Sequence, residues 1–243
     1  MNGIFYGVGV GPGDPQLLTL KAIKCISACD VIAVPVSKAE SLEPEFTEEE
    51  KEEILSGCAA YQIVLPVCPE VQNKPKLYLP MPMMKDKEKL KQIHDLCAHK
   101  ASEVLRMGKN VAFITLGDPT VYSTCLYVQK RLMKMGLDTE LIPGVPSFCA
   151  AAARMHMGLA ENKEEIHIIP ASYRVEESIR LPGTKVLMKA GRKMADVKRI
   201  VKEQKLSVKM VENCGMDSER VYESVDEIPE ETSYYSLMII KEE

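Results

Sequence analysis

Two turns rich in glycine and proline carry the residues best suited to chemistry in this chain. The first, Gly9–Pro15, reads Gly-Val-Gly-Pro-Gly-Asp-Pro, and the second, Gly117–Pro119, reads Gly-Asp-Pro. Each follows an apolar run of the kind that forms a buried strand. Because ligands of open parallel sheets bind beyond the carboxyl ends of the strands, we expect both turns to line one site. Asp118 would offer a carboxylate to a cation, and Gly117 would let a ligand approach the backbone, although an ordinary turn also explains a single Gly-Asp-Pro.

The first turn is poorly suited to a phosphate. A dinucleotide fingerprint needs regularly spaced glycines and free backbone amides at the start of a helix, whereas Pro12 and Pro15 each remove an amide donor. The chain contains no Gly-Lys-Ser/Thr sequence, which excludes a P-loop. We also find no Ser-His-Asp or Cys-His constellation of the kind that activates a protein nucleophile.

A third turn, Pro143–Cys149, precedes the run Ala150–Ala153. The small side chains predict a helix that can approach a neighbouring helix or a flat ring closely. Simple helix packing accounts for this pattern equally well.

Strands and helices alternate in the first half of the chain, which predicts a parallel sheet. We expect strands at 4–10, 30–36, 110–116 and 138–142, and helices at 16–29, 86–107 and 121–135. The prolines of the apolar stretch 77–84 should keep it from being a central strand. The acidic run Glu48–Glu53 is most simply a solvated helix face.

The second half of the chain has a different pattern. A helix is expected at 146–155, followed by strands at 165–170, 184–190, 207–213 and 234–241, with one helix at 195–204. We therefore predict two α/β domains whose boundary falls between residues 120 and 145. Drawn at the earlier limit, residues 1–120 form a parallel-sheet domain and residues 121–243 a mixed-sheet domain.

Composition narrows the class of protein. The 243 residues are 46% hydrophobic and 27% charged, a composition typical of globular proteins. The formal net charge of −4 argues against a nucleic-acid backbone as the main partner. The eight cysteines show no metal-site spacing with the histidines, so we expect no metal, and Cys25 and Cys29 should pack in the core. The sequence shows no signal-peptide pattern and no apolar run of about 18 residues, so we expect a cytoplasmic protein without a membrane span.

Five motifs, in order along the chain, resemble those of the tetrapyrrole (corrin/porphyrin) methylase family. They lie at 9–22, 115–124, 143–148, 185–189 and 211–214. Within that family, Leu79–Met83 followed by Asp86, together with the strings at 117–124 and 146–152, resemble the members that methylate C-20 of precorrin-2 or cobalt-factor II in cobalamin synthesis.

The resemblance implies a homodimer of two α/β domains, with S-adenosylmethionine held in a cleft between the domains and a tetrapyrrole as substrate. It implies no nucleic-acid or membrane partner. By motif, the residues that would contact the cofactor are Pro12, Leu116, Gly117, Asp118, Val121, Ser147, Phe148, Met188 and Asn213.

Methyl transfer from a sulfonium to carbon is an in-line displacement that depends mainly on alignment in a dry site. If a base removes a proton from the ring carbon, Asp118 and Tyr122 are the catalytic candidates. The substrate carries several carboxylates, and Arg is favoured for gripping them with two hydrogen bonds. Candidate partners for those carboxylates are Lys85, Lys87, Arg154, Arg174, Arg180 and Lys189.

Three other functions stay open from the sequence. A family member could methylate another ring carbon or act in siroheme or diphthamide synthesis. A nucleotide-binding oxidoreductase would want an acidic residue at the end of the second strand, where this chain has Val36-Ser37-Lys38. The third is a ligand-binding or assembly module without catalytic activity.

Overall fold

A computed structural model describes residues 1–38, 41–170, 175–189 and 194–242. The chain forms two compact units, unit 1 from Met1 to Pro146 and unit 2 from Ser147 to Glu243. Each unit has its own sheet and its own core, and each is described by itself.

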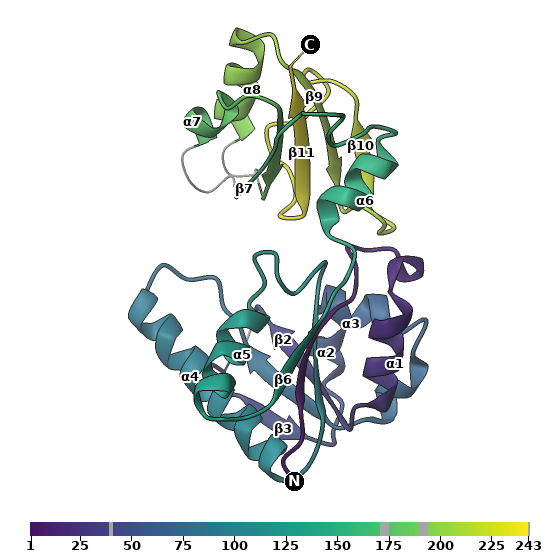
Figure 1. The fold of residues 1–243 in the computed structure, drawn as a ribbon, viewed down its shortest axis with the longest axis vertical. Coiled ribbons are helices and arrows are strands. Elements are labelled where there is room, and N and C mark those ends of the chain that lie inside the picture. Colours follow the sequence, from purple (N-terminus) through teal and green to yellow (C-terminus); the bar gives the residue numbers. More distant parts are fainter. Residues whose placement is uncertain (39–40, 171–174, 190–193, 243) are drawn as a thin grey trace. The chain divides into compact units, whose positions relative to one another are not determined.

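Unit 1 is built on a six-stranded sheet in the order β3-β4-β2-β5-β1-β6 (Figure 1). Neighbouring strands are parallel except for β3, which runs antiparallel to β4 at the edge of the sheet. The strands are β1 (Phe5–Gly9), β2 (Val31–Val36), β3 (Glu45–Thr47), β4 (Lys76–Pro80), β5 (Val111–Thr115) and β6 (Thr139–Ile142).

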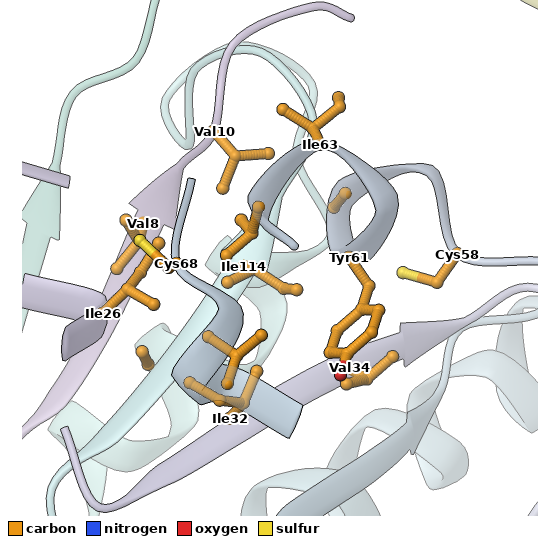
Figure 2. Packing of buried hydrophobic residues seen from close by; sticks show 14 of the residues in the cluster. Val8, Val10, Ile26, Ile32, Val34, Cys58, Tyr61, Ile63, Cys68 and Ile114 are labelled. Carbon is orange, nitrogen blue, oxygen red and sulfur yellow. The ribbon is translucent and has the colours of Figure 1, made fainter. Parts of the chain in front are cut away.

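Helices cover both faces of this sheet. α1, α2 and α3 lie on one face, and α4 and α5 lie on the other (Figure 1). Side chains from each set of helices form a buried core with the strands. Figure 2 shows the first of these layers, where Ile26 and Tyr61 from the helices meet Val8, Val34 and Ile114 from the strands. Because both faces are buried, the interior strands β1, β2 and β5 read as largely continuous apolar runs. The helical elements are η1 (Pro15–Leu17), α1 (Leu20–Ala28), α2 (Glu52–Ser56), α3 (Ala59–Val64), η2 (Pro69–Asn73), α4 (Lys87–Arg106) and α5 (Cys125–Lys134).

The expectation for the stretch 77–84 is wrong. β4 lies between β3 and β2, so it has a neighbour on each side. Pro80 is the last residue of the strand and Pro82 lies beyond it, so neither proline removes an amide from the middle of the ladder.

The acidic run Glu48–Glu53 is largely exposed, as expected, but only its end is helical. β3 precedes this run, and α3 and η2 follow α2; the sequence predicted none of these three elements. The side chain of Lys76 is fully buried, and its Nζ donates to the carbonyls of Gln72 at 2.9 Å and Lys74 at 2.6 Å. This long side chain therefore satisfies carbonyls at the end of η2 that would otherwise lack donors.

Unit 2 has a mixed five-stranded sheet in the order β10-β9-β11-β8-β7. β7 and β8 are parallel and the remaining pairs are antiparallel. α7 and α8 pack on one face and α6 on the other (Figure 1). The elements are α6 (Ser147–Arg154), β7 (Ile166–Pro170), α7 (Val175–Ile179), β8 (Thr184–Met188), α8 (Met194–Glu203), β9 (Ser207–Glu212), β10 (Arg220–Tyr222) and β11 (Ser236–Lys241).

The division between the units falls at Pro146, later than the boundary drawn at residue 120. The stretch 121–146 belongs to unit 1 for two reasons. β6 pairs with β1 in the first sheet, and Val128 and Leu132 of α5 are buried against the same core as α4.

All eight cysteines are free thiols. Cys29 is buried in the core of unit 1 and Cys25 packs partly against that core, which agrees with the packing role expected for them. Burial raises the pKa of the Cys97 and Cys125 thiols to about 12, so both stay protonated. No helix among the described residues is both long and apolar enough to cross a membrane.

A buried histidine should make the stability of unit 1 depend on pH. His94 of α4 is only 8% exposed, and its ring stacks on Tyr127 of α5 with centroids 4.5 Å apart. Burial, and then the neighbouring Arg131, lower the His94 pKa below its ordinary value of 6.5. As the pH falls below 6.5, the unfolded chain therefore takes up a proton that the folded chain resists, and the free energy of unfolding should fall.

The variant His94→Phe keeps a ring against Tyr127 and should lose this part of the pH dependence. Denaturant unfolding at pH 7.5 and pH 5.5 measures it. His99→Phe, at an exposed position of the same helix, is the control and should follow the unmodified protein. Equal pH dependence in His94→Phe and the unmodified protein would contradict this explanation.

Candidate active site

The two Gly-Pro turns lie side by side in unit 1, as the sequence predicts. They follow β1 and β5, which are neighbours in the sheet. The backbones of Gly11 and Gly117 are paired, with N···O distances of 3.2 Å and 2.8 Å in the two directions. Both glycines have positive φ, 77° and 71°, which residues with a Cβ rarely adopt. The turns therefore form one rigid structure.

The third turn joins them through close backbone contact. A Cβ on Gly144 would lie 2.2 Å from the carbonyl oxygen of Gly117, and a Cβ on Gly9 would lie 2.7 Å from the nitrogen of Gly144. No side chain fits at either position without moving the backbone. We call the meeting point of Gly9–Pro15, Gly117–Pro119 and Pro143–Pro146 the three-turn junction.

Asp118 ties the second turn to the third. One oxygen of its carboxylate accepts hydrogen bonds from the backbone N and the hydroxyl of Thr120, at 2.8 Å and 2.5 Å. The other oxygen accepts from the backbone N of Gly144 at 3.0 Å. The residue is 9% exposed, so these three donors take the place of water around a buried charge. Asp118 thus has a structural task that the sequence did not reveal.

Tyr122 stands on a strained loop just beyond Asp118. Its φ is +49°, an unusual value for a residue with a bulky side chain, and its ring is 51% exposed. The hydroxyls of Thr115 and Ser123 lie 2.9 Å apart and join the two ends of this loop, while the hydroxyl of Ser123 also accepts from the nitrogen of Cys125. Strained backbone of this kind is held by surrounding contacts and is common at functional sites.

Caps on the helical turns hold the first turn in place. The Asp14 carboxylate accepts from the nitrogen of Gln16 and caps η1, and the Thr19 hydroxyl accepts from the nitrogen of Ala22 and caps α1. The Thr19 hydroxyl also donates to the carbonyl of Pro143 at 3.4 Å, which links α1 to the third turn.

The expected cofactor residues of unit 1 all lie at or next to the junction. Pro12 and Gly117 are buried within it, and Leu116 and Val121 lie on either side of the Gly-Asp-Pro turn, half-buried. In unit 2, Ser147 and Phe148 form the first turn of α6, Met188 ends β8, and Asn213 directly follows β9.

The ends of β8 and β9 in unit 2 share an unusual backbone. Lys189 and Asn213 come directly after these strands and have φ values of 62° and 50°. The backbone N–H of Lys189 donates to the carbonyl of Ser236, and that of Asn213 donates to the carbonyl of Tyr235, each at 3.1 Å. The first residue of β11 and the residue before it therefore hold both strand ends. Lys189 Nζ lies 5.0 Å from the centre of the Tyr234 ring, a distance typical of a cation–π contact.

Several candidate partners for substrate carboxylates already have contacts. Arg154 pairs with Glu219, Arg180 pairs with Glu176, and Lys189 lies over Tyr234. Lys85 and Lys87 are exposed near the start of α4. Arg174 lies outside the described residues.

Within the described ranges, no three His, Cys, Asp or Glu side chains are arranged to hold a metal ion. His156 is exposed, and Nε2 of His167 lies 3.6 Å from a carboxylate oxygen of Glu165. The two histidines therefore lie apart from any cluster of ligands among these residues.

The sequence analysis did not single out Glu212, a buried carboxylate at the end of β9. The signal that could have indicated it is an acidic residue at the end of β9 (Ser207–Glu212), whose last residues are buried, so that an unpaired charge there would be costly.

Comparison with known proteins identifies relatives across the chain. The model of the Tetrapyrrole (Corrin/Porphyrin) Methylases matches residues 5–229. A probable cobalt-precorrin-2 C(20)-methyltransferase of Methanocaldococcus jannaschii is 36% identical, over 97% of this chain and 95% of its own length. The precorrin-2 C(20)-methyltransferase of a Sinorhizobium species is 24% identical, over 98% of this chain and 95% of its own.

A solved structure shares the fold. The uroporphyrin-III C-methyl transferase of Thermus thermophilus, determined with S-adenosylhomocysteine, has a TM-score of 0.67 and 22% identity, covering 99% of this chain and 98% of that one. With a family match from the first strand to beyond β10, and a relative 36% identical along nearly the whole sequence, the chain belongs to the tetrapyrrole (corrin/porphyrin) methylase family.

Proposed function

We propose that this protein transfers a methyl group from S-adenosylmethionine to C-20 of a corrin precursor, precorrin-2 or cobalt-factor II, in cobalamin biosynthesis. The observation that carries the proposal is the 36% identity to a probable C(20)-methyltransferase along almost the full length of both chains. The three-turn junction supports it, because the family's first three motifs meet there in one locked structure.

The chemistry of the junction suits a sulfonium cofactor better than a nucleotide phosphate. Asp118 supplies a negative charge, which favours a cation and disfavours a pyrophosphate. Prolines stand at positions 12 and 15, where a phosphate would need amide donors. By the family's motifs, the residues that would contact S-adenosylmethionine are Pro12, Leu116, Gly117, Asp118, Val121, Ser147, Phe148, Met188 and Asn213.

When bound, the cofactor supplies an activated methyl group. The protein's part is to hold the two reactants in line, which contributes through proximity and requires a rigid site. The paired glycines and the Asp118 bridge supply that rigidity in unit 1. No covalent intermediate with the protein is needed.

We propose that the Tyr122 oxygen accepts the proton that leaves the methylated ring carbon and passes its own hydroxyl proton to water, which the exposure of this side chain allows. Asp118 is not assigned this step, because both of its oxygens are already engaged by three donors. The variant Tyr122→Phe removes only the hydroxyl. It should lower kcat by about 10²-fold, the lower end of what a general base contributes, while leaving the affinity for S-adenosylhomocysteine unchanged. Initial rates and titration calorimetry measure the two effects.

Tyr127→Phe is the matched control, because Tyr127 has a similarly exposed ring on α5, outside the junction. It should keep both the rate and the affinity. A Tyr122→Phe enzyme with an unchanged kcat would remove this residue from the proton transfer.

The proposed reaction is tested with methyl-labelled S-adenosylmethionine and each of the two macrocycles. Label should appear at C-20 of at least one product, located by carbon NMR, and the macrocycle that reacts faster identifies the preferred substrate. Label at another ring carbon would place the protein in a different branch of the family. Transfer to neither macrocycle would overturn the assignment.

The remaining proposals concern assembly and location. The enzyme acts as a homodimer, and two large apolar side chains exposed on α4 and α5, Leu96 and Met133, are candidates for its contact surface. It works in the cytoplasm, where eight free thiols stay reduced. Light scattering during gel filtration tests the dimer: a mass near 27.1 kDa would contradict it.

A further inference from the structure

Glu212 is a buried acid that none of the proposed catalytic steps uses. It closes β9, is 6% exposed, and comes directly before Asn213. Its carboxylate accepts a hydrogen bond from the hydroxyl of Tyr222 on β10 at 2.7 Å. The other oxygen accepts from the backbone nitrogen of Ser233. Two donors thus compensate for the loss of water around this charge.

Ser233 connects this carboxylate to the amide of Asn213. While its backbone N–H donates to Glu212, its hydroxyl lies 3.1 Å from Asn213 Oδ1 and can donate to it. Asn213 Nδ2 donates to the carbonyl of Ser218 at 3.4 Å, so both ends of the amide have a partner. The backbone nitrogen of Asn213 is held by Tyr235, and its φ is +50°.

We infer that Glu212 is a positioning residue, which fixes the direction of the Asn213 amide through Ser233 and so sets the affinity for the cofactor. The inference rests on the proposed function, in which Asn213 contacts S-adenosylmethionine. An asparagine amide has two donor hydrogens and two acceptor lone pairs, and here one of each is bound within the protein. The remaining donor and acceptor then point in fixed directions toward a ligand.

A series of variants separates positioning from folding. Glu212→Ala removes the acceptor for Ser233, and Ser233→Ala removes the hydroxyl that reaches Asn213 while keeping the backbone N–H. Each should weaken the binding of S-adenosylhomocysteine by about tenfold, the effect of about 1.4 kcal/mol. Glu212→Gln can still accept from Ser233 through its oxygen and donate to the Tyr222 hydroxyl, so it should restore affinity close to that of the unmodified protein.

Tyr222→Phe is the matched control. This variant removes the Tyr222 hydroxyl, which donates to Glu212 but has no link to Asn213 through Ser233. Its affinity for S-adenosylhomocysteine should therefore stay that of the unmodified protein. The affinity for the tetrapyrrole should stay constant across the whole series, because only the cofactor contact is disturbed.

Coupling to Asn213 is the decisive measurement. In an Asn213→Ala background, Ser233→Ala should cause no further loss of S-adenosylhomocysteine affinity, because the amide that it orients is gone. Additive losses, or a folded Ser233→Ala protein with full affinity, would overturn the inference and leave the proposed function intact. If the unmodified protein binds no S-adenosylhomocysteine, the proposed function itself fails, so the two failures are distinguishable.

Discussion

Replacing Gly144 by alanine should weaken S-adenosylhomocysteine binding by about 10²-fold, because the change displaces the backbone of all three turns and each factor of ten in affinity corresponds to about 1.4 kcal/mol. The new methyl group would lie 2.2 Å from the Gly117 carbonyl oxygen and 2.8 Å from the Gly9 carbonyl carbon. These are backbone atoms in a paired structure, so no side-chain rotation relieves the contact. The three turns must separate, which would disturb the hydrogen bond from the Gly144 nitrogen to Asp118.

The same change should lower the free energy of unfolding by about 1–3 kcal/mol, the usual range for overpacking. Calorimetric titration gives the affinity, and denaturant unfolding gives the stability. Gly57→Ala is the matched control in the same unit, because a methyl group there meets its nearest atoms at 3.6 Å and the φ of −83° is ordinary. Gly144→Ala with the affinity and stability of the control would show that the junction tolerates separation.

The strands that position the site could be predicted because their pattern is simple. β1, β2 and β5 are covered by helices on both faces, so each is a continuous apolar run, and β1 and β5 end where glycine breaks the run. The neighbouring positions of Gly11 and Gly117 then follow from the parallel order of the strands.

Short elements were missed for the opposite reason. α3 and η2 span six and five residues, too few to show a helical period. The prediction for β4 was wrong because it treated proline as excluded from any interior strand. Pro80 is the last residue of β4, and a proline at the end of a strand does not interrupt its hydrogen bonds to both neighbours.

The contacts that lock the site are long-range, and local sequence does not contain them. Asp118 meets Gly144 across 26 residues, and Ser233 meets Asn213 across 20. The left-handed backbone of Tyr122 is equally hidden, because its own residue type disfavours that conformation and the surrounding loop imposes it. Motifs therefore predicted that the turns lie together, whereas the contacts of individual side chains required the structure.

Asp118→Asn is the second change that should have a large effect, because an amide cannot replace both oxygens of this carboxylate. Its single oxygen can accept from Thr120 or from Gly144, and its NH₂ group must then face another N–H donor. An unsatisfied donor at a site only 9% exposed costs about 1–3 kcal/mol. That cost would fall on the link between the second and third turns.

We therefore expect Asp118→Asn to weaken S-adenosylhomocysteine binding about tenfold or more, since 1.4 kcal/mol corresponds to a factor of ten. Asp14→Asn is the matched control: among the described residues, one Asp14 oxygen accepts a side-chain cap bond, from the Gln16 nitrogen, and an amide oxygen can take its place. If Asp118 served only as a general base, Asp118→Asn would lose its rate and keep its cofactor affinity. Loss of affinity together with lowered stability, in Asp118→Asn and not in Asp14→Asn, is the result that identifies the carboxylate as the bond holding the turns together.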